Sequence, residues 1–410
     1  MQTKTYRLEE VLTPRQEREW IDYPKQLYKG NPYWVCPIDE DVREVFDPQR
    51  NELFAEGEAI RWVVRDVAGA IVGRIAAFYN REKAAIEAKE EHGQPTGGCG
   101  FYESIDSQEV ANMLFDAARE WLAGKGMEAM DGPINFGQRR DWWGLLVEGF
   151  DHEPLYKNPY NPPYYKALFE NYGFQNYFNQ NSYNWKIGES EASSRLKDRA
   201  DRLYRQEAGY SIRRIDMKHL DEAAENFRVI YNKAWAMFSG VKPMEKEEAQ
   251  TIMKVMKPII DPNIIYFAYQ HDEPIGFFIT VPDLNCIIGR FGGKFGLWQK
   301  LRLMWELKVR KRCDRVFGII FGITPACHGK GVESAIMYEY LNYVQSEACP
   351  YKAIELAWIG DFNPVMNRMI INYAGASLYK VHTTYRYLFD REKEFKRCPR
   401  LGIKRTEKQE

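Results

Sequence analysis

The sequence predicts a protein of strands and helices built from two tandem copies of one folding unit. Residues 61–78 and residues 264–281 each read as two strands joined by a short turn, with glycine early in the second strand. Residues 161–173 and residues 363–375 each begin Asn-Pro, continue as an apolar pattern of helical period and end in glycine. Because hairpin and helix follow in the same order at similar offsets, a duplication explains the pattern better than chance.

The length and composition agree with two domains. The chain has 410 residues, 45% of them hydrophobic, and a domain typically has ~100–200 residues. The segment 188–208 is polar and charged, so we place the boundary there and expect either a linking helix or a coil. The predicted domains are residues 1–195 and residues 196–410.

The composition also argues against several classes of function. The net charge is −1, so no global basic field favours nucleic acid, and we expect no nucleic-acid partner. No apolar run approaches the ~20 residues of a membrane-spanning helix and the N-terminus lacks an export signal, so we expect a cytoplasmic protein. The seven cysteines and six histidines are scattered without metal-ligand spacing, so we expect no metal.

In the second half, alternating apolar residues predict strands, and apolar residues at helical spacing predict helices. The expected order is a strand at 210–215, helices at 220–237 and 246–256, the hairpin, a strand at 315–323, a helix from Val332, a strand at 353–359, a helix from Pro364 and a strand at 378–389.

The stretch FGITPACHGKGVESAI (321–336) connects the strand at 315–323 to the helix that follows it. This order and stretch resemble the GNAT acyltransferases, which place a loop of the pattern [RQ]-x-x-G-x-[GA] between a central strand and a helix. Gly329 and Gly331 match that pattern, whereas its leading Arg or Gln is Ala326 here. The resemblance implies an α+β fold of two tandem domains, each a mixed, mostly antiparallel sheet flanked by helices. It also implies an N-acyltransferase that uses acetyl-CoA, or another acyl-CoA, as co-substrate.

The glycine loop is suited to phosphate. A helix N-terminus leaves backbone N–H groups without partners and carries a partial positive charge, so it favours an anion. The alternative is an ordinary tight turn between strand and helix. The cofactor-binding residues that we expect, the last by resemblance alone, are Ile323, Cys327, His328, Gly329, Lys330, Gly331, Val332 and Asn363.

The corresponding segment of the first half, residues 99–122, has SIDSQE in place of the glycine loop. We expect Asp106 or Ser104 to cap that helix and Glu109 to make its first turn acidic, which would repel a pyrophosphate. We therefore predict that the second domain alone binds the cofactor and that the first is a degenerate copy for substrate binding or scaffolding.

Acceptor residues are expected in two places. The resemblance implies that Tyr231, Asn232 and Trp235 form an acceptor wall. Residues 135–165 form a long connection dense in aromatic residues, in which Arg139, Trp142 and Trp143 line either an acceptor pocket or the domain interface.

Glu355 is a candidate base because a carboxylate within an apolar strand has a raised pKa; the alternative is that it pairs with a Lys or Arg. At the position of the family's frequent acid tyrosine stands Ile370, and Tyr373 follows one turn later as a candidate acid.

Residues 292–315 form an insertion that reads as a basic amphipathic helix. Its apolar positions include Leu297, Leu301, Trp305 and Val309. We expect this apolar side to pack on its own domain with the charges solvated. The alternative is a peripheral contact of residues 294–312 with the anionic inner face of a membrane.

Three functions remain open. The first is transfer of an acyl group, acetyl by default, from CoA to a primary amine. The second is transfer of a long acyl chain to a lipid amine at a membrane surface. The third is a CoA-binding scaffold without catalysis, which Ala326 and the missing tyrosine would favour.

Overall fold

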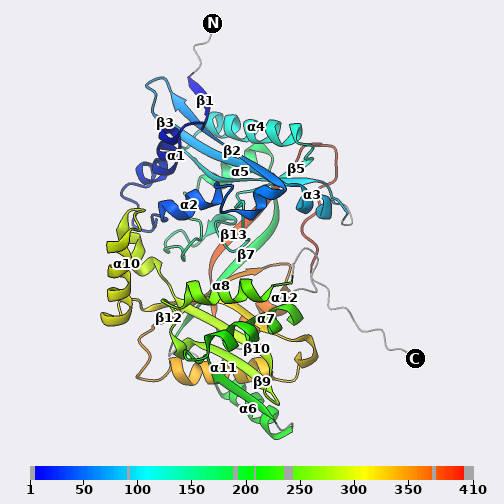
Figure 1. Ribbon diagram of the computed structural model, residues 1–410. Coiled ribbons are helices and arrows are strands. Elements are labelled where there is room, and N and C mark those ends of the chain that lie inside the picture. Colours follow the sequence, from blue (N-terminus) through cyan, green and yellow to red (C-terminus); the bar gives the residue numbers. More distant parts are fainter. Residues whose placement is uncertain are drawn as a thin grey trace, which may run out of the picture.

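A computed structural model describes residues 5–89, 93–187, 193–206, 209–234, 243–371 and 375–400. The molecule has two lobes, and the long strands β7 and β13 run between them (Figure 1). The first half forms the upper lobe in this view, and the second half forms the lower one.

The helices and strands of the first half are β1 (Tyr6–Glu10), α1 (Pro14–Leu27), α2 (Asp39–Val45), η1 (Glu52–Ala55), β2 (Gly57–Asp66), β3 (Ile71–Asn80), α3 (Arg81–Glu87), β4 (Thr96–Ser104), α4 (Gln108–Gly124), β5 (Ala129–Gly132), β6 (Leu145–Glu148), α5 (Tyr165–Tyr172) and β7 (Gln175–Lys186).

Those of the second half are α6 (Ser193–Gln206), β8 (Tyr210–Arg214), α7 (Leu220–Ala234), α8 (Lys246–Met256), η2 (Pro262–Ile264), β9 (Ile265–Gln270), β10 (Glu273–Pro282), α9 (Asn285–Ile288), η3 (Gly289–Phe291), α10 (Leu297–Met304), the π-helical turn η4 (Trp305–Val309), β11 (Arg315–Ile323), η5 (Pro325–Cys327), α11 (Val332–Val344), β12 (Ala353–Gly360), α12 (Pro364–Met369) and β13 (Ser377–Leu388). The expected second-half strands and helices are therefore present, and the predicted linker is partly the helix α6.

Two local predictions in the first half were wrong. Helix α5 begins at Tyr165 and not directly after Asn161, because the Asn161 amide is bonded to both backbone groups of Leu146 (2.7 and 3.1 Å). Helix α4 is capped by Ser107, not by Asp106 or Ser104. Ser104 still belongs to β4, and its hydroxyl is bonded to the Tyr102 hydroxyl at 2.7 Å.

The described strands form one sheet in the order β1-β2-β3-β4-β5-β13-β7-β12-β11-β10-β9-β8, with β6 paired to β13. The β4–β5 and β11–β12 pairs are parallel, and the other pairs are antiparallel. This confirms the expected mixed, mostly antiparallel sheet flanked by helices.

The two halves exchange their last strands. β7 of the first half pairs with β12 of the second, and β13 of the second half pairs with β5 of the first. Each core includes side chains from the other half: Trp185 of β7 lies in the second core and Tyr385 of β13 in the first. A buried bidentate pair of Arg386 with Asp131 (2.6 and 2.8 Å) also joins β13 to β5. Because they exchange strands, the two halves form one continuous sheet.

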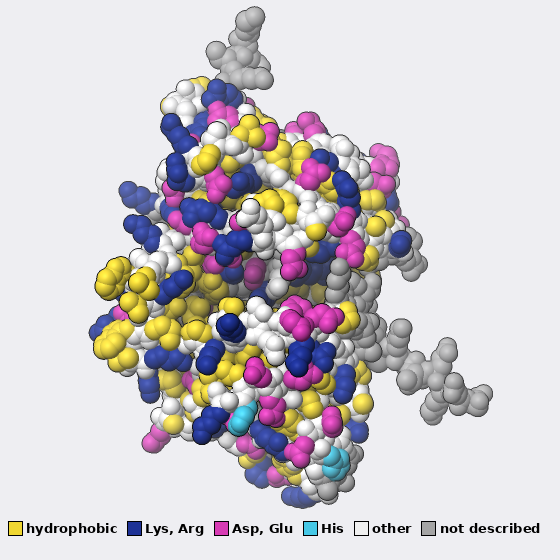
Figure 2. Space-filling model, in the orientation of Figure 1, with side chains coloured by type: hydrophobic (Ala, Val, Ile, Leu, Met, Phe, Trp, Pro, Cys, Tyr) yellow, Lys and Arg dark blue, Asp and Glu magenta, His cyan; other side chains and the backbone are white. Residues whose placement is uncertain are grey.

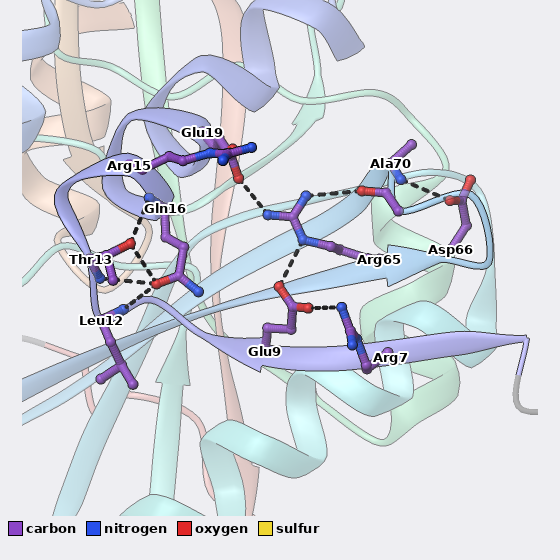
Figure 3. A network of polar contacts seen from close by, with 11 residues as sticks. Arg7, Glu9, Leu12, Thr13, Arg15, Gln16, Glu19, Arg65, Asp66 and Ala70 are labelled. Carbon is purple, nitrogen blue, oxygen red and sulfur yellow. Dashed lines mark hydrogen bonds and ion pairs between the residues drawn. The ribbon is translucent and has the colours of Figure 1, made fainter.

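A polar network on the surface fixes the N-terminal segment against the hairpin of the first half (Figure 3). Arg65 of β2 donates to Glu9 of β1 at 2.8 Å and also to Glu19 of α1. Helix α1 begins with a capping box in which Thr13 and Gln16 bond reciprocally. These contacts orient α1 and the chain that follows it.

Candidate active site at the diverging strands of the second half

The candidate site lies where two parallel strands separate. The pairing of β11 with β12 runs from Arg315–Ala353 to Gly318–Leu356. Beyond Gly318, β11 continues to Ile323 beside β10, whereas β12 has an irregular register against β7 after Leu356. Beyond Gly318, the edge of β11 on the β12 side has no strand partner among the described residues, so its backbone groups face the space between the two strands.

The glycine loop follows directly. Gly329 and Gly331 have φ values of 75° and 99°, in the left-handed region that glycine adopts without strain. A Cβ at Gly329 would meet nothing within 4 Å, so backbone conformation and not space requires glycine there. His328 is exposed, and its Nε2 lies 2.9 Å from the Ile323 carbonyl oxygen. Cys327 is buried and Lys330 is exposed.

The N-terminus of α11 has no side-chain cap. Gly331 occupies the N-cap position and Val332 begins the helix, so the first N–H groups of the helix are open to a ligand. The hydroxyl of Ser334, in the first turn, is buried and has no hydrogen-bond partner among the described residues. Helix α4 of the first half differs, because Ser107 accepts from Val110 N. Both helices carry a glutamate in the first turn, Glu333 and Glu109, so the cap and not the acid distinguishes them.

These features fit the pyrophosphate arm of a CoA-type ligand. Two glycines with positive φ, an uncapped helix start and exposed Lys330 and His328 offer backbone donors and positive charge on one surface. An unpartnered buried hydroxyl at Ser334 adds a donor near the same helix start.

Asn363 acts as the N-cap of α12, and its Oδ1 accepts from Met366 N at 3.2 Å. Its neighbour Asn367 is more strongly held, a feature that the sequence did not indicate. The Oδ1 of Asn367 accepts from the Tyr183 hydroxyl (2.6 Å) and from the Asn181 amide (3.1 Å). Both donors belong to β7, so the first half orients a polar group of the second half beside β12.

Glu355 lies in β12 and is fully buried. It forms an ion pair with Lys380 of β13 at 2.7 Å, and the Lys380 ammonium also donates to the Glu153 carbonyl at 2.7 Å. Burial raises the pKa of Glu355, while Lys380 opposes that shift. Burial lowers the pKa of Lys380. The structure therefore contains the ion pair that was the alternative to a base, and a role of Glu355 in proton transfer stays a prediction.

The aromatic connection of the first half reaches the second half at Trp358. The Trp358 indole, at the irregular point of β12, donates to the Arg139 carbonyl at 3.1 Å. The Arg139 guanidinium lies over the Trp143 ring at 5.7 Å. Trp142 packs on Phe101 of β4 with ring centroids 5.5 Å apart. Arg139 therefore lies beside the diverging strands, whereas Trp142 faces the first lobe.

Two of the three residues expected to form the acceptor wall lie within the described part of the chain. The Asn232 amide of α7 accepts a hydrogen bond from Met244 N (2.8 Å) and donates one to the Met244 carbonyl (3.0 Å). Tyr231 is half-buried, and its pKa is raised by burial and by Glu248, with Arg140 of the aromatic connection opposing the shift. Trp235 and Tyr373 lie outside the described residues.

The prediction that the apolar side of the insertion packs on its own domain was wrong. Leu297, Trp298, Leu301, Trp305 and Val309 are between 53% and 79% exposed. The buried side carries Leu303 and Leu307 instead, together with Glu306, whose carboxylate pairs with the arginines Arg302, Arg310 and Arg312. The three arginines are themselves exposed, so these ion pairs neutralise the buried Glu306 carboxylate while the basic side chains stay in solvent. Figure 2 shows hydrophobic side chains gathered at the edge where α10 lies.

Within the described residues, no group of three or more His, Cys, Asp or Glu side chains could hold a metal ion. Among the same residues, no helix is both long and apolar enough to cross a membrane.

The strand order, the diverging parallel strands and the glycine loop define a tandem GNAT-like fold. Comparison with solved structures supports this class. A tandem GNAT protein from the clavulanic acid biosynthesis pathway matches with a TM-score of 0.51 and 12% identity, over 94% of this chain and 98% of that one. The GCN5-related glucosamine N-acetyltransferase region of a fungal multi-domain β-N-acetylglucosaminidase matches with a TM-score of 0.55 and 12% identity, over 94% of this chain and 38% of that longer one.

Two curated proteins are similar along nearly their whole length. Protein YghO of Escherichia coli (strain K12) is 27% identical over 374 residues, which are 90% of this chain and 92% of that protein. Bacterial ceramide synthase of Caulobacter vibrioides (strain NA1000 / CB15N) is 26% identical over 379 residues, 92% of this chain and 95% of that protein. No protein-family model matches the chain.

Proposed function

We propose that this protein is an enzyme, a GNAT-type N-acyltransferase that moves an acyl group from acyl-CoA to a primary amine. The observation that carries the proposal is the uncapped N-terminus of α11, which follows Gly329 and Gly331 at the end of two diverging parallel strands. Similarity to a bacterial ceramide synthase, which by name forms an amide, agrees with this chemistry.

The residues divide the task as follows. Backbone N–H groups of the glycine loop and α11 bind the phosphates, and Lys330 and His328 add positive charge. When bound, acyl-CoA supplies an acyl group activated as a thioester. We assign the polarisation of its carbonyl to backbone N–H groups at the end of β11, beyond the pairing with β12. The amine nitrogen attacks the carbonyl carbon, a C–N bond forms, the C–S bond breaks, and the proton lost by the amine is taken up by the leaving thiolate.

For the donor and acceptor, we favour a long acyl chain and a lipid amine over the acetyl default. The exposed apolar side chains of α10 and η4 support this choice, because a soluble substrate requires no such surface. We call Leu297, Trp298, Leu301, Trp305 and Val309 the apolar ridge. Lysines and arginines flank the ridge, a combination suited to an anionic lipid surface.

Cofactor binding is tested by thermal shift with CoA, acetyl-CoA and palmitoyl-CoA. At 100 times its dissociation constant a ligand adds ~2.7 kcal/mol of stability. With ~2.1 cal/mol/K of unfolding entropy per residue, this raises the Tm of a protein of 410 residues by about 3 °C. Gly331→Asp should abolish the shift. The matched control is Gly69→Asp, which alters another glycine of positive φ (83°), in the exposed turn between β2 and β3.

Turnover separates the enzyme from a CoA-binding scaffold. Release of free CoA with long-chain amines, and its loss in Gly331→Asp, would support transfer. Tight CoA binding without release across a panel of amines would instead favour the scaffold. A preference for acetyl-CoA over palmitoyl-CoA in both assays would contradict the long-chain proposal and restore the acetyl default.

The membrane contact has its own test. The full chain should sediment with vesicles containing phosphatidylglycerol and much less with pure phosphatidylcholine vesicles. Trp298→Ser with Leu301→Ser should weaken that binding at least tenfold, because insertion of the two side chains stabilises the bound state by about 3 kcal/mol. Val255→Ser is the matched control, since Val255 is equally exposed (72%) and lies outside the ridge. Equal binding by the double variant and the control would exclude the ridge as the contact.

A further inference from the structure

A cavity of ≈ 90 Å³, lined by both polar and apolar groups, lies in the first half, away from the glycine loop. Its walls come from β3, β4, the chain before α2 and the aromatic connection, with Asn285 contributed by the second half. This volume is well above the ~10–15 Å³ that one water requires, so a small head group fits. The cavity faces the end of β4, the strand that corresponds to β11 in the duplicated fold.

The carboxylate of Glu103 is held in place at the wall. Its Oε2 accepts from the hydroxyls of Tyr28 (2.5 Å) and Tyr165 (2.9 Å). Its Oε1 has only a longer ion-pair contact, 3.7 Å to Arg74 Nη2, among the described residues. Oε1 is therefore oriented and has acceptor capacity left for a ligand. Burial raises the pKa of Glu103, so a cationic partner would compensate for the solvent that this carboxylate has lost.

A nitrogen donor near the same carboxylate is also able to bond a ligand. The Arg74 Nε, at the cavity wall, is buried without a hydrogen-bond partner among the described residues. Arg74 is otherwise occupied, because its Nη1 donates to the Trp20 carbonyl at 2.8 Å and its guanidinium stacks on the Trp20 ring at 4.3 Å. A buried donor without a partner lowers the stability of the folded state, and a ligand oxygen would supply the partner that the Arg74 Nε lacks.

The remaining walls favour a cation. Aromatic side chains, among them Trp34, Phe101 and Trp142, surround the space, and aromatic faces attract ammonium groups. Besides Glu103 and Arg74, the charged groups at the cavity are Asp41 and Lys157. Lys157 pairs with Asp41 (3.7 Å) and with Asp141 (4.0 Å). The charged lining is therefore balanced, two carboxylates against two cations, and the aromatic faces provide the preference for an ammonium group.

The cavity adjoins the insertion that carries the apolar ridge. Ile38 and Tyr156 line the cavity, and both contact the hydrophobic cluster that contains Leu303 and Leu307, on the buried side of α10 and η4. In Figure 2, hydrophobic side chains continue from the edge at α10 into the hollow between the two lobes. An alkyl chain attached to a bound head group would therefore have apolar surface next to it.

We propose that this cavity is a second ligand site, which binds the amine head of a single-chain amphiphile against Glu103. A hydroxyl or carbonyl beside that amine would accept a hydrogen bond from the Arg74 Nε. The inference rests on the proposed function in one respect, which is the identification of this ligand as the acyl acceptor. The binding itself is independent of CoA and can be measured without it.

The test uses isothermal titration calorimetry on the full chain, with decylamine below its micelle concentration as the probe and decanol as its uncharged match. Decylamine should bind more tightly than decanol. Glu103→Gln keeps the shape and an acceptor for the tyrosines but removes the charge, so decylamine should bind about ten- to a hundredfold more weakly. Glu58→Gln is the matched control, because Glu58 also accepts from a tyrosine, Tyr79 (2.6 Å), outside the cavity.

A second variant guards against misfolding of the first. Trp34 is only half-buried, so Trp34→Ala should fold and should also weaken decylamine binding. Equal binding of decylamine and decanol to the wild type, or unchanged decylamine binding in Glu103→Gln or in Trp34→Ala, would overturn the proposal. Gly331→Asp should abolish CoA binding and leave decylamine binding intact. If decylamine binds as expected but CoA does not, the proposed function fails and this site stands.

Discussion

Lys380→Met is the substitution that most directly tests how the two halves are joined. The Lys380 ammonium bonds Glu355 of β12 and the carbonyl of Glu153, and both members of the ion pair are at most 2% exposed. Methionine retains most of the volume of the lysine but leaves the Glu355 carboxylate buried without its cation. Removing one partner of a buried pair typically costs about 3–5 kcal/mol.

For 410 residues that share one sheet, about 2.1 cal/mol/K per residue converts this loss into a fall in Tm of about 4–6 °C. The pH dependence has a definite sign. Burial already raises the folded pKa of Glu355, and loss of Lys380 removes the main opposing charge. The folded variant then binds a proton more tightly than the unfolded chain does, so its deficit should shrink as the pH falls toward 5.

The measurement is differential scanning calorimetry at pH 7 and pH 5 on the wild type, Lys380→Met and the double variant Lys380→Met/Glu355→Leu. The double variant should recover most of the lost stability, since an apolar pair removes the buried charge. Lys197→Met is the control, because it breaks an exposed pair with Asp201 and should cost less than about 1 kcal/mol. A cost below about 1 kcal/mol for Lys380→Met, or a deficit that grows at low pH, would refute the reasoning.

Three further predictions follow from the same contacts. His382 is buried beside Lys380, and its pKa is lowered to about 4. The free energy of unfolding should therefore fall by about 2 kcal/mol between pH 7 and pH 5, because the unfolded chain takes up a proton that the folded one does not. In His382→Gln, calorimetry should find that this part of the pH dependence of stability is missing. Residues 1–190 and residues 191–410, expressed separately, should each lack a cooperative thermal transition, because β7 and β13 would lose their partners, and co-expression should restore it; a cooperative transition in either fragment would contradict the exchange. Asn367→Ala should lower kcat/KM for CoA release about tenfold and leave the CoA thermal shift unchanged, whereas the exposed substitution Arg368→Ala should change neither.

The elements of the second half were predictable from sequence because each carries a local signal. Pro364 begins α12, glycines precede α11, and apolar alternation identifies β11 and β12. The exchange of β7 and β13 was not predictable, since an apolar strand does not encode which edge it pairs with. The exposed ridge was misjudged for a related reason. A helical wheel cannot register that three arginine partners allow Glu306 to be buried beside Leu303 and Leu307, which leaves the predicted apolar side exposed.

The same contacts explain why the chain keeps a first half without a glycine loop. Tyr183 and Asn181 of β7 orient Asn367, and the Arg139 carbonyl accepts from Trp358 at the irregular point of β12. These three contacts place groups of the first half beside β12 and α12. A second half alone would therefore have the glycine loop but would lack these contacts. Absence of a glycine loop from the first half leaves the contacts intact, whereas loss of β7 would remove two of them, so the second half depends on β7 even though the first half has no such loop.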